Sequence, residues 1–173
     1  MIRVFGAHGN IQNVDNFLKK ILDFAQNHSI IIQVFNADMI YGKNHIISSV
    51  EHAKRAMNSK TNTTNSLGME ILLYASGERQ LKLAIPKMGV KKGQSNIAFV
   101  FLSFNKKIKV KMIDHLSDEI LKLLSFYRND AILDGNKSVL KRFGIDETEI
   151  STVSKDKYGD LILEKIAMVD IIK

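Results

Sequence analysis

The stretch Ile97-Ala98-Phe99-Val100-Phe101-Leu102-Ser103-Phe104 is the strongest strand signal in the chain. All but one of its residues are aliphatic or aromatic, and such side chains suit a pleated sheet. A second run, Ile30-Ile31-Ile32-Gln33-Val34-Phe35, is almost as continuously apolar, as expected of a strand whose faces are covered. We predict that both runs are interior strands of one sheet and that residues 1–8 form another strand. The predicted core includes Ile32, Leu72, Phe99 and Phe101.

Helical patterns fill most of the sequence around these strands. Apolar residues recur every three or four positions from Val14 to Ala25, which predicts an amphipathic helix. The apolar segment Leu67–Ala75 predicts an enclosed helix, and Ser117-Asp118-Glu119 is typical of a helix start. Further helices are predicted at 43–58, up to Met88, at 136–143 and at 156–172. This arrangement indicates an α+β fold, a two-layer sandwich whose mainly antiparallel central sheet is packed by helices.

Length and composition bound the class of protein. A chain of 173 residues can bury one sizeable core, and no linker or repeat divides it, so residues 1–173 are predicted to form a single domain. No apolar run approaches the roughly 20 residues that span a bilayer. The absence of cysteine fits a reducing compartment, so we expect a cytoplasmic protein that does not bind membranes. A net charge of +7 favours polyanions such as nucleic acids as partners.

Motifs that would indicate an enzyme are missing from the sequence. It has no phosphate-binding loop, nucleophile elbow or set of kinase motifs. His45 and His52 are seven residues apart, and without a third ligand nearby we interpret them as a solvent-facing pair rather than a metal site. Glu70 interrupts an apolar helix, and we interpret it as a buried carboxylate paired with Arg79 or with backbone N–H groups, not as a catalytic base. We expect no catalytic residue, metal or cofactor.

Three blocks of sequence resemble one known family. The first is Asn36-Ala37-Asp38-Met39-Ile40, which continues through Gly42 and His45 into the following helix. The second is Ser66-Leu67-Gly68-Met69-Glu70-Ile71-Leu72. The third is Ser76-Gly77-Glu78-Arg79-Gln80, which leads into Ala84-Ile85-x-x-Met88-Gly89. In order and spacing they are similar to the kinase-binding accessory subunits of the KEOPS tRNA threonylcarbamoylation complex (TPRKB-like). The similarity is best over residues 36–104, and residues 108–136 match no family pattern.

The resemblance implies an accessory role. Subunits of this family dock on the kinase-like ATPase subunit of KEOPS and meet the other KEOPS subunits indirectly. A separate catalytic subunit transfers the threonylcarbamoyl group to tRNA. Family members of this type also grip tRNA, notably at its CCA end. Animal members depart from the Ser76–Gln80 block, so its presence here favours tRNA binding.

The pair Ser76-Gly77 lies where one predicted helix ends and the next begins. We expect unpaired N–H groups and the positive end of a helix to form a phosphate site there. Basic and short polar side chains nearby would extend the contact, because single-stranded RNA is read by hydrogen bonds to base edges. The predicted tRNA-binding residues are Lys60, Asn62, Thr63, Ser76, Gly77, Arg79, Lys82, Lys87, Lys91 and Lys92. A solvated basic helix edge is the simpler alternative.

A second basic cluster follows the strongest strand. Its members are Lys106, Lys107, Lys109 and Lys111. A strand of eight residues spans about 26 Å, so we predict that this cluster and Lys91-Lys92 lie at opposite ends of the sheet. The second cluster is expected to make a separate contact with tRNA or to form only a soluble face.

The last predicted helix is apolar around most of its circumference, with Leu163, Ala167 and Ile171 opposite a longer apolar stripe. A helix of this kind is buried on more than one face. Together with the resemblance, this pattern predicts that the longer stripe contacts the kinase. The predicted kinase-interface residues are Tyr158, Leu161, Ile162, Ile166 and Val169. The alternative is a helix sunk into the chain's own core.

A second function is also compatible with the sequence. Ser76-Gly77 could hold the phosphate of a small molecule or nucleotide, with Glu70 as a buried acid, in an enzyme or regulator. An RNA-binding adaptor needs basic residues well beyond such a pocket, and Lys60, Lys87 and Lys91-Lys92 are candidates for them. The extent of the basic surface therefore separates the two hypotheses.

Overall fold

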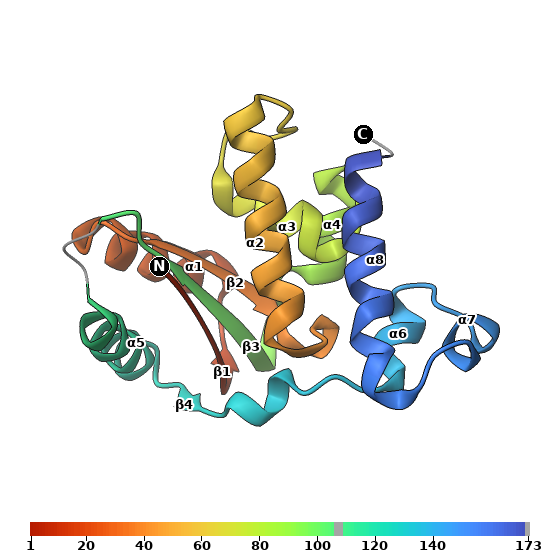
Figure 1. Cartoon of the computed structure of the whole chain (residues 1–173). Helices are drawn as coiled ribbons and strands as arrows, with labels where there is room; N and C mark the ends of the chain where they lie inside the picture. Colours follow the sequence, from red (N-terminus) through yellow and green to blue (C-terminus); the bar gives the residue numbers. More distant parts are fainter. Residues whose placement is uncertain (106–108, 172–173) are drawn as a thin grey trace. The chain divides into compact units, whose positions relative to one another are not determined.

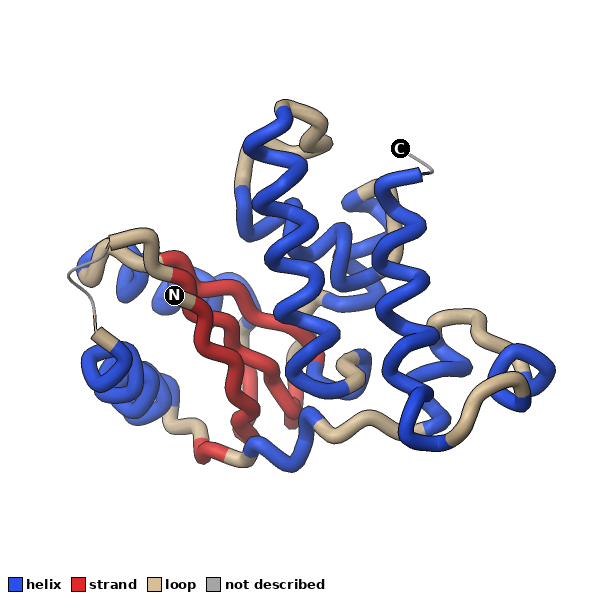
Figure 2. The backbone as a smooth tube through the Cα atoms, in the orientation of Figure 1, coloured by secondary structure: helices blue, strands red, loops and turns tan. Residues whose placement is uncertain are grey.

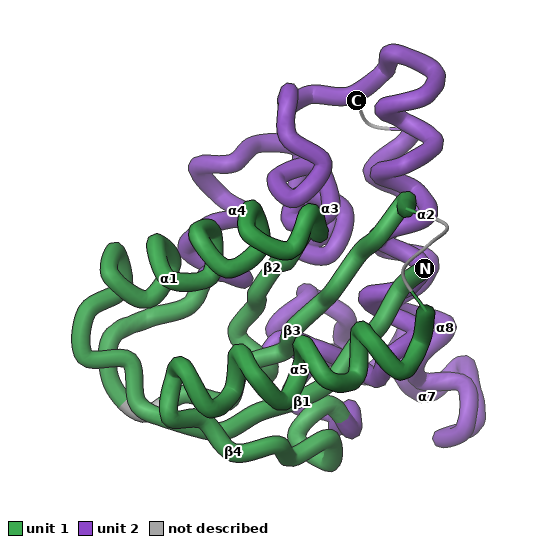
Figure 3. The backbone as a smooth tube through the Cα atoms, turned by 90° about the vertical axis from the view of Figure 1, so that its left-hand side faces the viewer, with its two compact units in different colours: residues 1–38, 90–133 green, residues 39–89, 134–173 purple. Residues whose placement is uncertain are grey.

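The computed structural model describes residues 1–105 and 109–171, and Figure 1 shows the order of their helices and strands. The strands, red in Figure 2, all belong to one sheet. The chain divides into two compact units, coloured separately in Figure 3. Unit 1 comprises Met1–Asp38 and Val90–Leu133, and unit 2 comprises Met39–Gly89 and Asp134–Lys173. Unit 1 contains the sheet, and the described part of unit 2 is helical.

The sheet of unit 1 is antiparallel and consists of β1 (Ile2–Ile11), β2 (Ile31–Asn36), β3 (Gly93–Leu102) and β4 (Tyr127–Arg128). The strand order is β2-β3-β1-β4, and Phe99 of β3 lies opposite Phe5 of β1 and Val34 of β2. The prediction of an interior strand is confirmed for β3, although it ends at Leu102 and leaves Phe104 exposed. The same prediction is wrong for β2, which lies at an edge of the described sheet. Its apolar run reflects burial of side chains, which does not require pairing along both edges.

Two helices, α1 (Val14–Asn27) and α5 (Val110–Leu124), cover one face of this sheet (Figure 3). Each helix turns one apolar stripe towards the strands, as its helical spacing of apolar residues requires. The buried side chains that the two helices contribute to the core include Phe17, Ile21, Ile113, Leu116 and Ile120. Sheet and helices therefore form two layers around one core.

Aromatic rings from neighbouring strands occupy the centre of this core. The ring of Phe5 stacks on that of Phe99 with centroids 5.1 Å apart and meets Phe101 edge-on. The core predictions for Phe99, Phe101 and Leu72 are confirmed, since each is almost completely buried. Ile32 is only partly buried at the margin of the core, as its place on the edge strand explains.

The segment that follows β3 contains more helix than the sequence predicts. α5 begins at Val110, so the predicted start at Ser117 is wrong. Ser117 is buried in the middle of α5, where its hydroxyl donates to Ile113 O at 2.7 Å. A serine that bonds the carbonyl four residues earlier is accommodated within a helix, although the same residue type also suits a cap.

Part of the second basic cluster falls in this segment. Lys106 and Lys107 lie outside the described residues. Lys109 and Lys111 are exposed around the first turn of α5. The ten residues of β3 separate them along the chain from Lys91 and Lys92, which are also exposed.

Unit 2 is a group of packed helices. Their bounds are α2 (Gly42–Ser59), α3 (Leu67–Ser76), α4 (Leu81–Met88), α6 (Lys137–Arg142), α7 (Glu147–Ser151) and α8 (Tyr158–Ile171). α2 and α8 lie side by side and run in the same direction (Figure 1), and α3 packs against both. Residues 71–76 of α3 are all buried, which confirms the predicted enclosed helix.

The predicted fold class is confirmed: the protein is an α+β sandwich with an antiparallel sheet packed by helices. Short 3-10 turns at Ala37–Met39, Asp130–Leu133 and Lys155–Lys157 connect the longer elements. Across residues 1–105 and 109–171, no helix has the length and apolar character needed to cross a bilayer.

We expect the two units to unfold together, as a single domain should. Each unit is assembled from two separate stretches of chain, and the backbone passes between units after Asp38, Gly89 and Leu133. The two segments of each unit are joined through the other unit. When one unit unfolds, it becomes a long flexible loop between those segments, and the closure of this loop costs entropy. Urea unfolding should show one transition, coincident by far-UV circular dichroism and by fluorescence of the tyrosines, of which Tyr41, Tyr74 and Tyr158 lie in unit 2. Two separated transitions would contradict this prediction.

Candidate functional site

The block Ser76–Gln80 connects two helices, as predicted, but Ser76-Gly77 lies at the C-terminal end of the first helix and not at the start of the second. α3 ends at Ser76, and Gly77 follows in the left-handed region with a φ of 68°, as is common for a glycine after a helix. α4 begins only at Leu81. A helix C-terminus presents carbonyl oxygens and the negative end of the dipole. The predicted phosphate site at Ser76-Gly77 is therefore wrong.

Local hydrogen bonds satisfy two of the four last carbonyls of α3. The Gly77 N–H donates to Tyr74 O at 3.0 Å and the Glu78 N–H donates to Leu73 O at 3.2 Å, which together form a Schellman cap. The Ser76 hydroxyl donates to Leu73 O at 2.8 Å and accepts from the Glu78 N–H at 3.2 Å. Ser76 therefore stabilises the turn from within and offers no free hydroxyl to a ligand.

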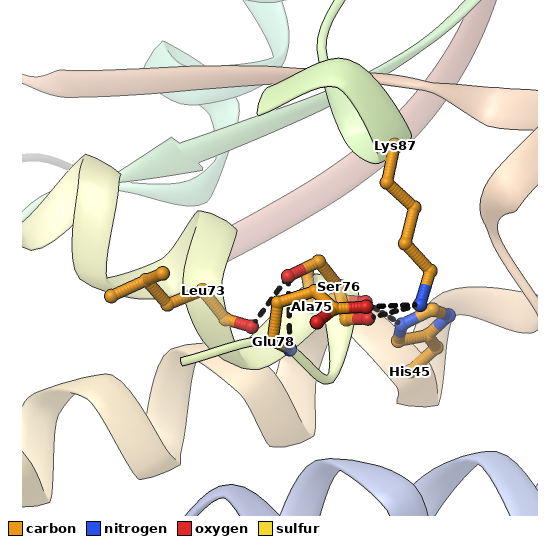
Figure 4. A network of polar contacts seen from close by, with 6 residues as sticks. All are labelled: His45, Leu73, Ala75, Ser76, Glu78 and Lys87. Atoms are coloured by element: carbon orange, nitrogen blue, oxygen red, sulfur yellow. Dashed lines mark hydrogen bonds and ion pairs between the residues drawn. The ribbon is translucent and has the colours of Figure 1, made fainter. Parts of the chain in front are cut away.

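Side chains from two other helices satisfy the remaining carbonyls of α3. His45 of α2 bonds through Nε2 to Ala75 O at 2.8 Å. Lys87 of α4 donates from Nζ to Ser76 O at 2.7 Å and pairs with Glu78 Oε1 at 3.1 Å (Figure 4). The end of α3 is thereby fastened to α2 on one side and to α4 on the other.

His45 is a buried, neutral hydrogen-bond donor. Its Nδ1 accepts the Tyr41 N–H at 3.1 Å, so the proton must be on Nε2, where Ala75 O accepts it. Burial lowers the pKa of His45 to about 4. The predicted solvent-facing histidine pair is wrong, because His45 is wholly buried and the partly exposed His52 bonds through Nδ1 to Asp170 Oδ2 at 2.7 Å.

Glu70 is buried and organises the loop that precedes α3. Its Oε2 accepts the N–H groups of Thr63 at 3.1 Å and Thr64 at 3.0 Å, and the Thr64 hydroxyl at 3.1 Å. Of the two predicted pairings, the one with backbone N–H groups is confirmed. Asn62 also acts within the loop, since its Nδ2 donates to Thr64 O at 2.9 Å.

The predicted tRNA-binding residues differ in how accessible they are. Ser76 is buried, Lys87 and Asn62 hold turns of the chain, and Gly77 is partly buried. The exposed members are Lys60, Thr63, Arg79 and Lys82 of unit 2 and Lys91 and Lys92 of unit 1. These six side chains are the most accessible of the predicted set.

Among the predicted tRNA-binding residues of unit 2, the exposed cations fall into two groups rather than one. Lys60 precedes α3 and Arg79 follows it, and ten residues of helix span about 15 Å. Lys60 occupies the left-handed region with a φ of 57°, where it ends α2. Arg79 and Lys82 project from the turn after α3 and from the first turn of α4. A ligand that contacts both groups must be long enough to follow α3.

The predicted kinase-interface stripe on α8 is mostly buried. Ile162, Ile166 and Val169 are 0% exposed, and α8 packs against α2, α3 and α6 of the same unit. These three residues are therefore removed from the predicted surface, because their side chains complete the chain's own helix packing. Tyr158 and Leu161 are partly exposed. The exposed apolar residues of α8 lie on its other side and are Ala167, Met168 and Ile171.

Asp170 fastens the last turn of α8 to two helices. It accepts hydrogen bonds from the Tyr74 hydroxyl of α3 and from His52 of α2. Burial and this carboxylate raise the pKa of Tyr74, so its hydroxyl stays protonated. Among residues 1–105 and 109–171, no group of three His, Asp or Glu side chains is placed to hold a metal ion.

Sequence reasoning missed the roles of His45 and Lys87 in this site. His45 closes the first of the three sequence blocks, whereas Lys87 takes an unspecified position in the continuation of the third, so block membership was a signal for His45 alone. Nothing local marks either side chain as the partner of a helix end. Their carbonyl partners are 30 and 11 residues away in the sequence.

The chain belongs to the kinase binding protein CGI-121 family, because the model of that family matches residues 8–170. It is 28% identical over 151 residues to the regulatory protein Cgi121 of Methanocaldococcus jannaschii, a match that covers 85% of this chain and 88% of that protein.

The buried His45 predicts a loss of stability in acid. Its pKa is about 4 in the folded state against 6.5 when unfolded, so the unfolded state binds more protons between these values. The contribution of His45 to the free energy of unfolding should therefore be fully present above pH 6.5 and fall by about 3 kcal/mol as the pH drops to 4. Urea unfolding of the protein and of His45→Gln across this range measures the effect. The two should differ in their pH dependence, and identical slopes would count against the buried neutral histidine.

Proposed function

We propose that the chain is a non-catalytic KEOPS subunit that acts in the cytoplasm. In this role it binds and stimulates the kinase-like ATPase subunit and meets the other KEOPS subunits through it. It also helps recruit tRNA by the CCA end for threonylcarbamoyladenosine formation. The observation that carries the proposal is family membership over nearly the whole chain. The name of the relative, a regulatory protein, supports a regulatory rather than a catalytic role.

The exposed apolar side of α8 is the proposed kinase contact. Met168 is 40% exposed and Ile171 is 73% exposed, and Ala167 lies between them and the partly exposed Leu163. Large apolar side chains on one helix face are typical of surfaces that bind another protein. This surface replaces the buried stripe that the sequence pattern favoured.

The proposed tRNA contact consists of Arg79 and Lys82, with Lys60 as a second point beyond the other end of α3. Arg79 and Lys82 make no ion pair within the described part of the chain, so their charges are available to phosphates. The net charge of +7 supports a polyanionic partner.

The alternative of a nucleotide-binding enzyme or regulator loses its main support. That hypothesis placed a ligand phosphate on N–H groups at Ser76-Gly77, and these residues end a helix instead. It also used Glu70 as an acid, whereas Glu70 accepts hydrogen bonds from the loop at 63–64.

A matched pair of substitutions on α8 tests the kinase contact. Met168→Glu should leave stability within about 0.5 kcal/mol, because the side chain is exposed, yet weaken kinase binding at least tenfold by placing a charge in a desolvated contact. Ile166→Glu buries an unpaired charge and should destabilise the fold by about 3 kcal/mol or more. Calorimetric titration with the kinase-like ATPase and urea unfolding give the two quantities. Normal binding by Met168→Glu would show that this side of α8 is not the contact.

The tRNA contact is tested with intact tRNA and with tRNA lacking its CCA end. Arg79→Ala should weaken binding of intact tRNA and lower its salt slope by about one, because one phosphate contact is lost. Lys60→Gly should act in the same way without harming the fold, since glycine removes a cost of about 1 kcal/mol at a left-handed position. Neither should matter for trimmed tRNA.

The control for this prediction is Lys111→Ala, an exposed lysine of unit 1. It should affect both RNAs equally or neither. Equal affinity of the unaltered protein for intact and trimmed tRNA would exclude a CCA-specific site while leaving the kinase-binding role untouched.

A further inference from the structure

We propose that Lys87 is not a phosphate ligand but a positioning residue, which holds the turn at residues 77–80 in one conformation so that Arg79 and Lys82 are presented to RNA. The inference rests on the proposed tRNA contact and names the device that organises it. It separates lysines that build the site from those that bind.

The ammonium group of Lys87 carries three N–H donors, and two of them are used within the chain. One is directed to Ser76 O at 2.7 Å and one to Glu78 Oε1 at 3.1 Å. The ammonium also lies 4.3 Å from the centroid of the Phe143 ring, where a cation is attracted to the ring face. The side chain is only 19% exposed, so a phosphate would have to displace existing partners.

The two oxygen partners of Lys87 lie on either side of the residue at which the chain turns. Ser76 and Glu78 flank Gly77, whose φ of 68° reverses the chain after α3. Lys87 lies in the last turn of α4, eleven residues from Ser76. Its side chain therefore ties the far end of α4 back to the turn from which α4 emerges (Figure 4). A turn closed in this way cannot open without breaking both bonds.

The charges around the turn are divided between structure and surface. Glu78 neutralises Lys87, and the pair is partly buried. Arg79 and Lys82 are exposed and have no such partner among the described residues. A turn that is ordered before RNA binds loses little conformational freedom on binding. Such pre-ordering commonly raises the affinity several-fold.

Lys87→Met tests this role, because methionine keeps an apolar stem beside Phe143 but removes the charge and the donors. Amide hydrogen exchange at residues 77–81 of the free protein should become at least several-fold faster, and Lys87→Arg should restore protection. The matched control Lys82→Met, on the same helix but exposed, should leave exchange unchanged. Faster exchange in Glu78→Gln supplies the same test if Lys87→Met does not fold.

Titration with intact tRNA at several salt concentrations separates positioning from direct contact. Lys87→Met should weaken binding about three- to tenfold with an unchanged salt slope. Lys82→Met should instead lower the slope by about one. A lower slope in Lys87→Met, or unchanged exchange in both Lys87→Met and Glu78→Gln, would overturn the inference. If the unaltered protein does not bind tRNA, the proposed function fails, and the exchange experiment still decides whether Lys87 holds the turn.

Discussion

The buried C-terminal end of α3 is the constraint on which the rest of unit 2 depends. Its last four residues are almost completely excluded from solvent, so their carbonyl oxygens need donors from the protein. The local cap supplies donors for two of them, and His45 and Lys87 supply the others. Loss of either side chain leaves a buried carbonyl without a donor. The free-energy cost of that unpaired carbonyl exceeds the net stabilisation that the hydrogen bond provides. This requirement fixes α2 and α4 on α3 and gives the turn after α3 a defined course.

The same logic explains how a basic protein uses its charges. Lys87 is neutralised by Glu78 and faces inward, whereas Arg79 and Lys82 stand on the turn that Lys87 closes. Glu70 holds the loop before α3, as Lys87 holds the turn after it. The buried carboxylate of Glu70 accepts hydrogen bonds from the N–H groups of Thr63 and Thr64. A buried carboxylate therefore holds the loop before α3, and a partly buried lysine paired with a carboxylate holds the turn after it. Rigid loops of this kind present side chains at little conformational cost.

The helix α8 shows how one element can serve both the fold and a partner. Ile162, Ile166 and Val169 are inside unit 2, and Asp170 ties the last turn to Tyr74 and His52. Met168 and Ile171, on the same two turns, are exposed. Because one side of α8 is anchored in unit 2, the apolar residues on its other side stay exposed to a partner.

The sequence by itself determined the class of the fold and most of its elements. The apolar run at 97–102 identified the central strand, the pattern at 67–75 identified an enclosed helix, and the isolated charge of Glu70 identified a buried carboxylate that needs N–H donors. Such features follow from local periodicity and from the cost of burying a charge, so no knowledge of distant neighbours is required. The blocks that mark the family are equally local.

Tertiary structure alone decided that β2 occupies an edge of the sheet and which side of α8 is covered. It also decided that Lys87 is a structural cation rather than a free one. Each of these depends on a partner remote in the sequence, as His45 and Ala75 are 30 residues apart. A residue pattern indicates that a group must be buried or paired. Which residue becomes its partner is decided only in the folded chain, where distant segments come together.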